Sequence, residues 1–419
     1  MRVLLIGNDG RVYAMAKNMK KHKHTLAVIG GREYMDSMFE TVCRDTLLDD
    51  WYMNAFVERF RPDLIVPVSW EPSYAGTVDM LRERGYTVFG ASKSGVALEA
   101  DKEFGLSVVS KAGVPVAPFC TVRNDSEIDY VMSMAGYCVV KQLGFAGGRG
   151  VTVFDPADKA GIRKKARLIV AQDGVAMLQK KIEGTPVNIV WMQTERGPVP
   201  ICLQTDYKRT YCGNLGPFCG AMGAVVWNCV PNGIVETMIA PLSDYLVSKQ
   251  YFGRVGLDCM YEQDTGKLYA IEWTARWGTP TTEVLLHTLD ADLALYLHAW
   301  SCGLAGGCDF DRALYGVGVV LAGGGYPYPD MVKQGMPIKI KGGMKNLIPI
   351  GVEGSLSALR TQGGRHMVAV GRGETLRDAR LSADWAIKRV SFEDMLYRID
   401  IGADIKKQKL FEQIQERWG

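Results

Sequence analysis

The chain has 419 residues, of which 47% are hydrophobic and 23% are charged, a balance typical of folded globular proteins and not of disordered ones. Lys and Arg number 49 against 46 Asp and Glu, so the net charge of +3 gives no electrostatic reason to expect nucleic-acid or membrane binding. The ten cysteines include no Cys-x-x-Cys pair, the first strand begins at residue 2, and no apolar run reaches membrane-spanning length. We therefore expect a cytoplasmic protein of two to four domains.

The first 118 residues alternate short apolar runs with amphipathic stretches, which predicts a parallel sheet covered by helices. The expected strands cover residues 2–7, 25–29, 64–68 and 87–89, and the expected helices cover residues 13–21, 50–60, 74–84 and 102–112. A glycine turn from Gly7 to Gly10 opens the first helix, where backbone N–H groups can hold a phosphate. The turn contains only two of the glycines that a dinucleotide-binding fingerprint requires, so by itself it is weak evidence for a nucleotide site.

A stiff extended linker, Val114–Pro118, separates this domain from a small second region, residues 119–190. Two apolar strands, residues 137–141 and 151–153, flank a loop rich in glycine. Such a loop can close over anionic groups, with Lys141 and Arg149 supplying positive charge. The alternative interpretation is an ordinary hairpin loop.

Residues 191–325 are predicted to form a mostly antiparallel, glycine-rich region that ends in a helix near residues 283–300. Residues 326–419 form the expected last domain, with strands at 337–340 and 367–370 and a helix from residue 375. The amphipathic tail, residues 403–418, is expected to pack back on the body of the protein.

The segment Leu268–Pro280 is the most informative part of the chain. It places Glu272, Thr274 and Arg276 at alternate positions of a predicted strand, so the three side chains point to the same face. Asp264-Thr265-Gly266 predicts a hairpin turn that brings Asp258 beside Glu272. Two facing carboxylates suit a hard cation such as magnesium bound to polyphosphate oxygens. A solvated edge strand with ordinary charges is the alternative.

Four features in this order and spacing resemble the ATP-grasp superfamily, and specifically the phosphoribosylamine–glycine ligase family. They are Lys102, Lys141 with its glycine loop, the segment Gln204–Ala224 and the segment Leu268–Pro280. The resemblance covers nearly the whole chain and implies an ATP-grasp fold of the α/β class, α+β in its central part. It implies an N-terminal parallel-sheet domain, a small lid subdomain at residues 119–190, a large catalytic subdomain at residues 191–325 and a β-rich C-terminal domain.

The implied activity is the ligation of a carboxylate to an amine through an acyl phosphate, at the expense of ATP, with Mg²⁺ or alternatively Mn²⁺. In the family the carboxylate is glycine and the amine is phosphoribosylamine. The partners implied are thus small molecules, and the chain is expected to be a monomer or a homodimer.

The resemblance also implies roles for individual residues. Nucleotide contacts fall to Lys102, Lys141, Gly147, Gly148, Arg149, Gly150, Gln179, Lys181 and Ile182. Metal ligation falls to Glu272 and Thr274, and also to Asp258, which stands where this family has an apolar residue and where other ATP-grasp enzymes place a metal-binding acid. The catalytic and amino-acid site comprises Arg276, Lys208, Arg209 and Asp206, and further substrate contacts fall to Gly10, Glu71, Gly216, Pro217, Gly220, Met222 and Gly223.

Several positions depart from the family pattern. Thr274 replaces an Asn, which changes a metal ligand from an amide oxygen to a hydroxyl. Thr279 and Thr281 replace acids. Other replacements fall in the amino-acid loop, where Phe218, Cys219 and Ala221 stand for Asn, Thr and Gly.

Asp9 in the first turn replaces a glycine and is expected to repel a sugar phosphate. Three further hypotheses therefore stay open: a different amino acid or amine, for instance a nucleotide-linked one; a non-catalytic nucleotide-binding relative; and a dinucleotide-dependent dehydrogenase, which leaves the acidic hairpin unexplained.

Overall fold

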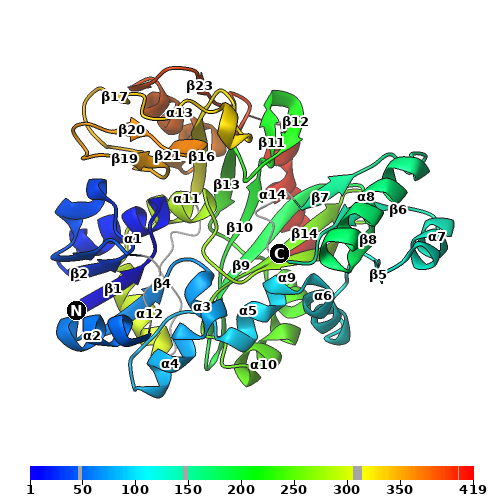
Figure 1. The fold of residues 1–419 in the computed structure, drawn as a ribbon, viewed down its shortest axis with the longest axis horizontal. Helices are drawn as coiled ribbons and strands as arrows, with labels where there is room; N and C mark the ends of the chain where they lie inside the picture. Colours follow the sequence, from blue (N-terminus) through cyan, green and yellow to red (C-terminus); the bar gives the residue numbers. More distant parts are fainter. Residues whose placement is uncertain (46–49, 145–149, 305–313, 404) are drawn as a thin grey trace.

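The N-terminal region of the computed structural model is a parallel sheet, as the alternating pattern predicts. The structure describes residues 1–45, 50–144, 150–304, 314–403 and 405–419. Four strands pair in the order β3-β2-β1-β4: β1 (Arg2–Ile6), β2 (Thr25–Ile29), β3 (Thr41–Cys43) and β4 (Leu64–Pro67). The helices of this region are α1 (Gly10–Lys21), α2 (Asp50–Phe60), α3 (Glu71–Ala75), α4 (Thr77–Glu83), α5 (Lys93–Ala100) and α6 (Lys102–Lys111) (Figure 1).

One helix boundary of this region differs from the prediction. The stretch expected as a single helix over residues 74–84 is divided into α3 and α4 at Gly76, whose φ is +92°. Glycine adopts this left-handed conformation without the steric cost that other residues meet, so the helix breaks there.

A second, four-stranded sheet forms the small region that projects to one side in Figure 1. Its order is β5-β8-β6-β7, with β5 (Phe119–Val122), β6 (Tyr137–Lys141), β7 (Val151–Val153) and β8 (Ala176–Lys180). The helices α7 (Asp125–Ser133) and α8 (Lys159–Asp173) cover it and share its separate apolar core, which includes Val122, Ile128, Ile162 and Leu178. The expected lid region therefore has a core of its own.

A nine-stranded antiparallel sheet forms the centre of the molecule. Its path runs β15 (Lys267–Thr274), β14 (Gly253–Glu262), β9 (Thr185–Thr194), β10 (Gly197–Asp206), β13 (Gly223–Trp227), β16 (Tyr315–Gly323), β21 (Arg365–Gly373) and β18 (Leu347–Pro349), with β23 (Met395–Leu396) beside β16. The sheet crosses the expected boundary at residue 325, because β16 pairs with β13 on one side and with β21 on the other. The catalytic and C-terminal regions thus share one continuous sheet.

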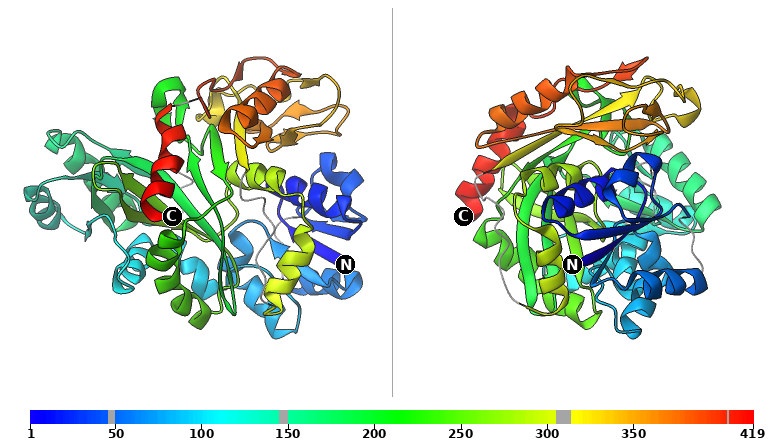
Figure 2. Two further views of the ribbon diagram at one scale, coloured as in Figure 1. Left: turned by 180° about the vertical axis from the view of Figure 1, so that it is seen from behind. Right: turned by 90° about the vertical axis from the view of Figure 1, so that its left-hand side faces the viewer.

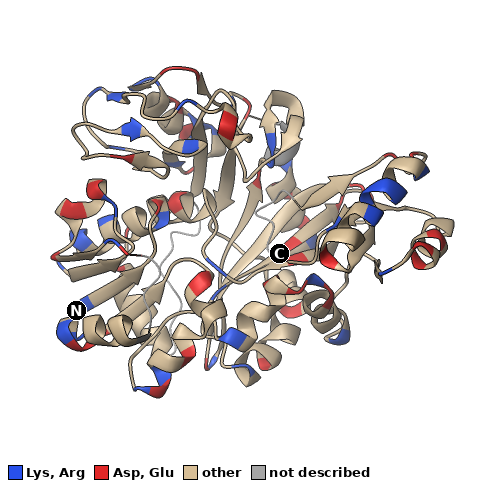
Figure 3. Cartoon of the chain, viewed as in Figure 1, with Lys and Arg blue, Asp and Glu red and all other residues tan. Residues whose placement is uncertain are grey.

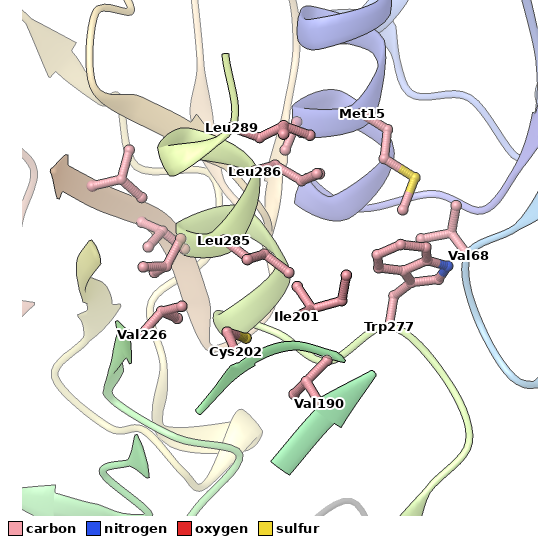
Figure 4. Close-up of a cluster of buried hydrophobic side chains, with 14 of the residues drawn as sticks. Met15, Val68, Val190, Ile201, Cys202, Val226, Trp277, Leu285, Leu286 and Leu289 are labelled. Atoms are coloured by element: carbon pink, nitrogen blue, oxygen red, sulfur yellow. The ribbon is translucent and has the colours of Figure 1, made fainter. Parts of the chain in front are cut away.

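The short helix α11 (Thr281–Thr288) joins the N-terminal region to this sheet. Figure 4 shows Leu286 and Leu289 on the side of Met15 from α1, and Leu285 on the side of Ile201 and Cys202 from β10. The single helix expected over residues 283–300 is instead α11 and α12 (Leu293–Ser301), separated by a short break capped by Asp292. Burial on both faces makes α11 a rigid platform for the loop that precedes it.

The remaining α-helices and strands lie outside these three sheets. They are β11 (Arg209–Tyr211), β12 (Leu215–Phe218), α9 (Asn232–Ile234), α10 (Ala240–Ser248), β17 (Lys339–Ile340), β19 (Val352–Glu353), β20 (Arg360–Thr361), α13 (Leu376–Ile387), β22 (Val390–Ser391) and α14 (Ile405–Trp418). The tail helix α14 packs back on the sheet as expected (Figure 2). The centre of the Phe411 ring lies 5.5 Å from the centre of the Trp227 ring.

The linker expected to be extended also takes part in the fold. Val116 forms a parallel bridge with Ala270, and the Ala117 amide donates to the Ala270 carbonyl at 3.0 Å. The linker thus lies along β15 and ties the lid region to the acidic hairpin. Across the described residues, no helix combines the length and apolar character that a membrane crossing requires.

Candidate active site

A cavity of about 920 Å³ lies where the N-terminal region, the lid region and the large sheet meet. Its walls contain side chains from all three, including Lys102, Lys141, Lys208, Asp258, Glu272 and Arg276. Basic and acidic positions are interspersed along the cartoon in Figure 3, in keeping with the small net charge. The cavity brings together residues that are up to several hundred positions apart in the sequence.

The predicted acidic hairpin is confirmed in its register. Asp258 on β14 is the direct partner of Glu272 on β15, and the residues between the strands form the expected turn. The register shifts by one residue immediately after Asp258, which is the signature of a β-bulge. Both carboxylates line the cavity, with side-chain exposures of 12% and 23%.

The ammonium of Lys208 lies between these two acids. Its Nζ is 3.1 Å from Asp258 Oδ2 and 3.6 Å from Glu272 Oε1. Burial alone would raise the pKa of Asp258, but the Lys208 charge and hydrogen bonds from its neighbours hold it below its usual value. In turn, Asp258 raises the pKa of Lys208 against the effect of burial. Lys208 therefore contacts the acid pair, and its expected place beside the amino-acid substrate stays a prediction.

Two buried amides, absent from the sequence-based site, orient Asp258. The Asn188 side-chain amide donates to Asp258 Oδ1, and Gln204 Nε2 donates to Asn188 Oδ1 at 3.0 Å. Asn188 and Gln204 are 6% and 3% exposed. Both are polar residues inside otherwise apolar strands, and this was the signal available in the sequence.

The two lysines assigned to the nucleotide approach the same cavity. Lys141 is 3% exposed and donates to the Ile271 carbonyl at 3.1 Å, and burial lowers its pKa to about 8 despite the opposing charge of Glu272. Lys102 donates to the carbonyls of Leu143 and Gly144, and burial lowers its pKa as well. An approaching anion would favour the charged form of both lysines.

The glycine loop lies only partly within the described residues. Gly147, Gly148 and Arg149 fall outside them, whereas Gly150 lines the cavity. The backbone amide of Gln142 donates to the Gly150 carbonyl at 2.9 Å, and Lys141 pairs with Val151 across the two strands. The base of the loop is thus closed as a β-hairpin beside the two lysines.

The segment expected to bind adenine forms another wall of the cavity, which includes Gln179, Lys181 and Ile182. The Gln179 side chain is 2% exposed and donates to the Ala117 carbonyl at 3.2 Å. Lys181 donates its backbone amide to Gly136 at 3.0 Å, and its ammonium is 2.5 Å from Glu183. Because the Lys181 amide already donates to Gly136, only the other backbone groups of this segment remain to bind a ligand.

The amino-acid loop is divided between the cavity and the core. Phe218, Cys219, Gly220 and Ala221 line the cavity. Met222 is fully buried and Gly223 packs against the Gly318 carbonyl in the sheet, so neither lies on the cavity wall.

The hairpin before this loop is held by Arg209. Its guanidinium lies 3.7 Å from the centre of the Phe218 ring and donates to the Gly216 carbonyl at 2.8 Å. Gly216 and Pro217 belong to β12, outside the cavity wall, while Asp206 at the end of β10 lines it. Of these residues, Arg209, Phe218 and Asp206 are positioned to meet a ligand.

Residues from the first turn and from β21 also line the cavity. Asp9 is paired with Arg11 at 2.5 Å, and Arg11 also donates to the Trp277 carbonyl at 2.6 Å. Burial would raise the pKa of Asp9, but Arg11 and then Arg365 lower it below its usual value. Two guanidinium groups therefore offset the charge of Asp9, and its expected repulsion of a sugar phosphate stays a prediction.

Gly10 and Glu71 have different positions. Glu71 lines the cavity at the start of α3. A Cβ on Gly10 would lie 2.2 Å from Ile350 Cγ2 and 2.8 Å from the Pro349 carbonyl, so this glycine permits the close approach of α1 to the C-terminal region. Gly10 thus serves packing, while its neighbours Asp9 and Arg11 face the cavity.

The acid pair fits a divalent metal bound together with a nucleotide. Within the described residues there is no group of three or more His, Cys, Asp or Glu side chains that would hold a metal without help. Magnesium is commonly held by one or two carboxylates plus substrate phosphates, and Asp258 and Glu272 already surround a cation. Thr274, on the same cavity wall, adds a hydroxyl oxygen.

Comparison with protein families matches three consecutive parts of the chain. Residues 1–99 match the N domain of phosphoribosylglycinamide synthetase, residues 100–282 match its ATP-grasp domain, and residues 316–404 match its C domain.

Similar sequences cover nearly the full length. The phosphoribosylamine–glycine ligase of Corynebacterium ammoniagenes is 29% identical, with 96% of this chain and 97% of that protein covered. The same enzyme of Clostridium acetobutylicum is 26% identical, with 96% of this chain and 99% of that protein covered.

Solved structures share the fold. A crystal structure of phosphoribosylamine–glycine ligase from Thermotoga maritima has a TM-score of 0.80 at 24% identity and covers 96% of this chain and 100% of its own. Biotin carboxylase from Campylobacter jejuni, solved in complex with a β,γ-ATP ligand, has a TM-score of 0.73 at 13% identity and covers 100% and 97%. The predicted fold class is confirmed, and the chain belongs to the phosphoribosylglycinamide synthetase, or phosphoribosylamine–glycine ligase, family of ATP-grasp proteins.

Proposed function

We propose that this chain is an ATP-dependent ligase that joins glycine to phosphoribosylamine and forms glycinamide ribonucleotide, ADP and phosphate. The observation that carries the proposal is the convergence of Asp258, Glu272, Lys141 and Arg276 on one cavity, in a chain whose relatives are named for this reaction. The expected monomeric or homodimeric state and the cytoplasmic location remain predictions from the sequence.

The reaction transfers a phosphoryl group and then an acyl group. A carboxylate oxygen of the amino acid attacks the γ-phosphorus of ATP, ADP leaves, and an acyl phosphate forms. The amine then attacks the acyl carbon, phosphate leaves with the electron pair of the broken C–O bond, and the amine gives up a proton. Both steps bring anions together, so positioning and positive charge provide most of the acceleration.

The residues of the cavity supply that charge. Lys102 and Lys141 would contact the nucleotide phosphates, and Arg276 would stabilise the transferring phosphoryl group. Asp258 and Glu272 would hold Mg²⁺, with Mn²⁺ as a substitute, and the ion would neutralise phosphate charge when bound. Gly150 and the neighbouring loop residues would cover the phosphates, which excludes water from the acyl phosphate.

The substrate end of the cavity supports an anionic amine. Arg11 and Arg365 line this end and offset the charge of Asp9, while Glu71 is a second acid near Arg11. The two guanidinium groups would bind the sugar phosphate of phosphoribosylamine.

A second candidate is a ligase of the same type for a different amino acid or amine. The observation that favours it is the cavity wall itself, which Phe218, Cys219 and Ala221 line in place of smaller or more polar groups. Thr279 and Thr281 also line the cavity without a charge. These changes alter the shape and hydrogen bonding of the substrate end.

The test is turnover with defined substrate pairs. The purified protein is incubated with ATP, Mg²⁺ and a panel of amino acids and amines, and ADP, phosphate and the amide are measured. Product from glycine and phosphoribosylamine supports the leading proposal, and product from another pair supports the second candidate. If no pair gives ADP, the result supports a non-catalytic nucleotide-binding protein. The Glu272→Gln variant should keep its fold and lose nearly all turnover, and full activity in it would remove the metal role from Glu272.

A further inference from the structure

Lys208 occupies the place between the two acids where a divalent ion is expected. Its Nζ contacts Asp258 at 3.1 Å and lies 3.6 Å from Glu272. A divalent ion bound by the same oxygens would come within a few ångströms of this ammonium. Two cations at such a distance repel strongly in a partly buried site, so both cannot occupy it.

The structure indicates which partner moves. Asp258 is fixed by the Asn188 amide, which is itself held by Gln204, and its side chain is only 12% exposed. The Lys208 side chain is 38% exposed and has a flexible four-carbon stem. The acids therefore form the rigid part of the site and the lysine side chain the adjustable part.

The backbone at Lys208 is anchored, so its side chain can turn without moving the strand. The Lys208 carbonyl accepts from the Cys219 amide at 3.0 Å. Tyr207 is 1% exposed, donates its amide to Gly223 at 3.0 Å and accepts from Met222 at 2.8 Å. These bonds also fix Lys208 beside the loop from Phe218 to Ala221, the wall assigned above to the carboxylate substrate.

We propose that Lys208 is an exchangeable cation: it neutralises Asp258 and Glu272 in the nucleotide-free protein, and the metal of the nucleotide displaces its ammonium toward the carboxylate-substrate wall. This inference rests on the proposed function. Its consequence is an order of binding, because the carboxylate-substrate wall gains the Lys208 charge only after the metal nucleotide is in place. Lys208 is thus a positioning residue that links the two subsites.

The exchange predicts competition between Lys208 and a metal in the absence of nucleotide. Lys208→Met removes the ammonium and keeps much of the side-chain volume, so Mn²⁺ alone should bind at least about tenfold more tightly than to the unmodified protein. Free Mn²⁺ is measured by electron paramagnetic resonance during titration. Unchanged or weaker Mn²⁺ binding by a folded Lys208→Met variant would overturn the proposal.

The chain offers a matched control. Lys333 also lies between two acids, 2.6 Å from Glu393 and 2.9 Å from Asp394, and does not line the cavity. Lys333→Met should leave the Mn²⁺ titration at the strong site unchanged. An equal gain in affinity in both variants would mean that the loss of any positive charge explains the result, and would overturn the exchange.

A second measurement uses the unmodified protein and does not depend on the folding of a variant. An amine-reactive reagent is applied in the presence of nucleotide alone and of nucleotide with Mg²⁺, and the modification of each lysine is quantified by mass spectrometry. Displacement predicts a several-fold increase at Lys208 and no change at Lys333. Equal or lower labelling of Lys208 with metal would contradict the exchange.

The metal experiments and the turnover test can fail independently of each other. If the substrate pairs give ADP but neither metal experiment shows exchange, the ligase stands and the Lys208 proposal is wrong. If exchange is found and no pair gives ADP, the ligase proposal is wrong while the exchange at the acid pair stands.

Discussion

Glu99 on α5 forms an ion pair with Arg276, the residue two positions beyond β15, with 3.2 Å between Oε1 and Nε. The second oxygen of Glu99 accepts from the Ala275 amide at 2.7 Å. Arg254 donates to the Arg276 carbonyl at 2.6 Å, so backbone and side chain are both fixed. One helix of the N-terminal region therefore sets the direction in which the Arg276 guanidinium enters the cavity.

Glu99→Gln tests this positioning. The substitution keeps the shape of the side chain and removes the charge that holds Arg276, so we expect kcat to fall about tenfold while the KM for ATP changes little. Steady-state kinetics measure both constants, and thermal unfolding checks the fold. Glu103→Gln is the matched control, because Glu103 pairs with Arg123 at 3.5 Å on the exposed side of the neighbouring helix α6. Unchanged kcat in Glu99→Gln would show that Arg276 needs no such support.

The sequence predicts the acidic hairpin well because its signals are local. Alternation, the turn residues 264–266 and two short strands determine which side chains face each other, and the structure pairs Asp258 with Glu272. The same local reasoning places β1, β2 and β4, but it misses β3, and the strand expected over residues 87–89 is only an isolated bridge between Val88 and Ile65. The break at Gly76 and the division into α11 and α12 are boundary details that local patterns resolve poorly.

The rest of the site depends on contacts between distant segments. Lys208 meets acids 50 and 64 positions away, and nothing near it in the sequence indicates this contact. Glu99 and Arg365 reach the cavity from elements that carry no recognisable motif. The union of β13, β16 and β21 into one sheet is likewise a non-local pairing, which explains why a boundary was expected at residue 325.

Ala221 adopts a left-handed conformation, with φ at +76°, on the cavity wall. A residue with a Cβ is strained there by roughly 1–2 kcal/mol relative to glycine. Ala221→Gly should therefore raise the free energy of unfolding by about 1 kcal/mol, measured by urea denaturation. Ala171→Gly in the helix α8, where the side chain is exposed, should lower it by up to about 1 kcal/mol. Destabilisation by both variants would mean that the lost methyl contacts outweigh the strain at Ala221.

Glu283 is a fully buried carboxyl group on the first turn of α11, directly behind the cavity wall. Its Oε1 accepts from the Thr279 hydroxyl at 3.2 Å, and its Oε2 has no hydrogen-bond partner in the part of the chain that the structure describes. Burial, followed by the charge of Asp9, raises its pKa to about 8, although Arg11 and Arg365 oppose the shift.

This raised pKa gives the stability of the protein a defined pH dependence. Between the unfolded pKa of about 4.3 and the folded value, the folded state binds more protons than the unfolded state, so stability falls as pH rises. Glu283→Gln removes this loss, and the variant should gain about 2 kcal/mol relative to the unmodified protein between about pH 6 and pH 8. Urea denaturation at both pH values measures the difference, with Glu236→Gln as a control at an exposed helical position. Parallel stability curves for the unmodified protein and Glu283→Gln would show that Glu283 is already ionised near neutral pH in the folded protein.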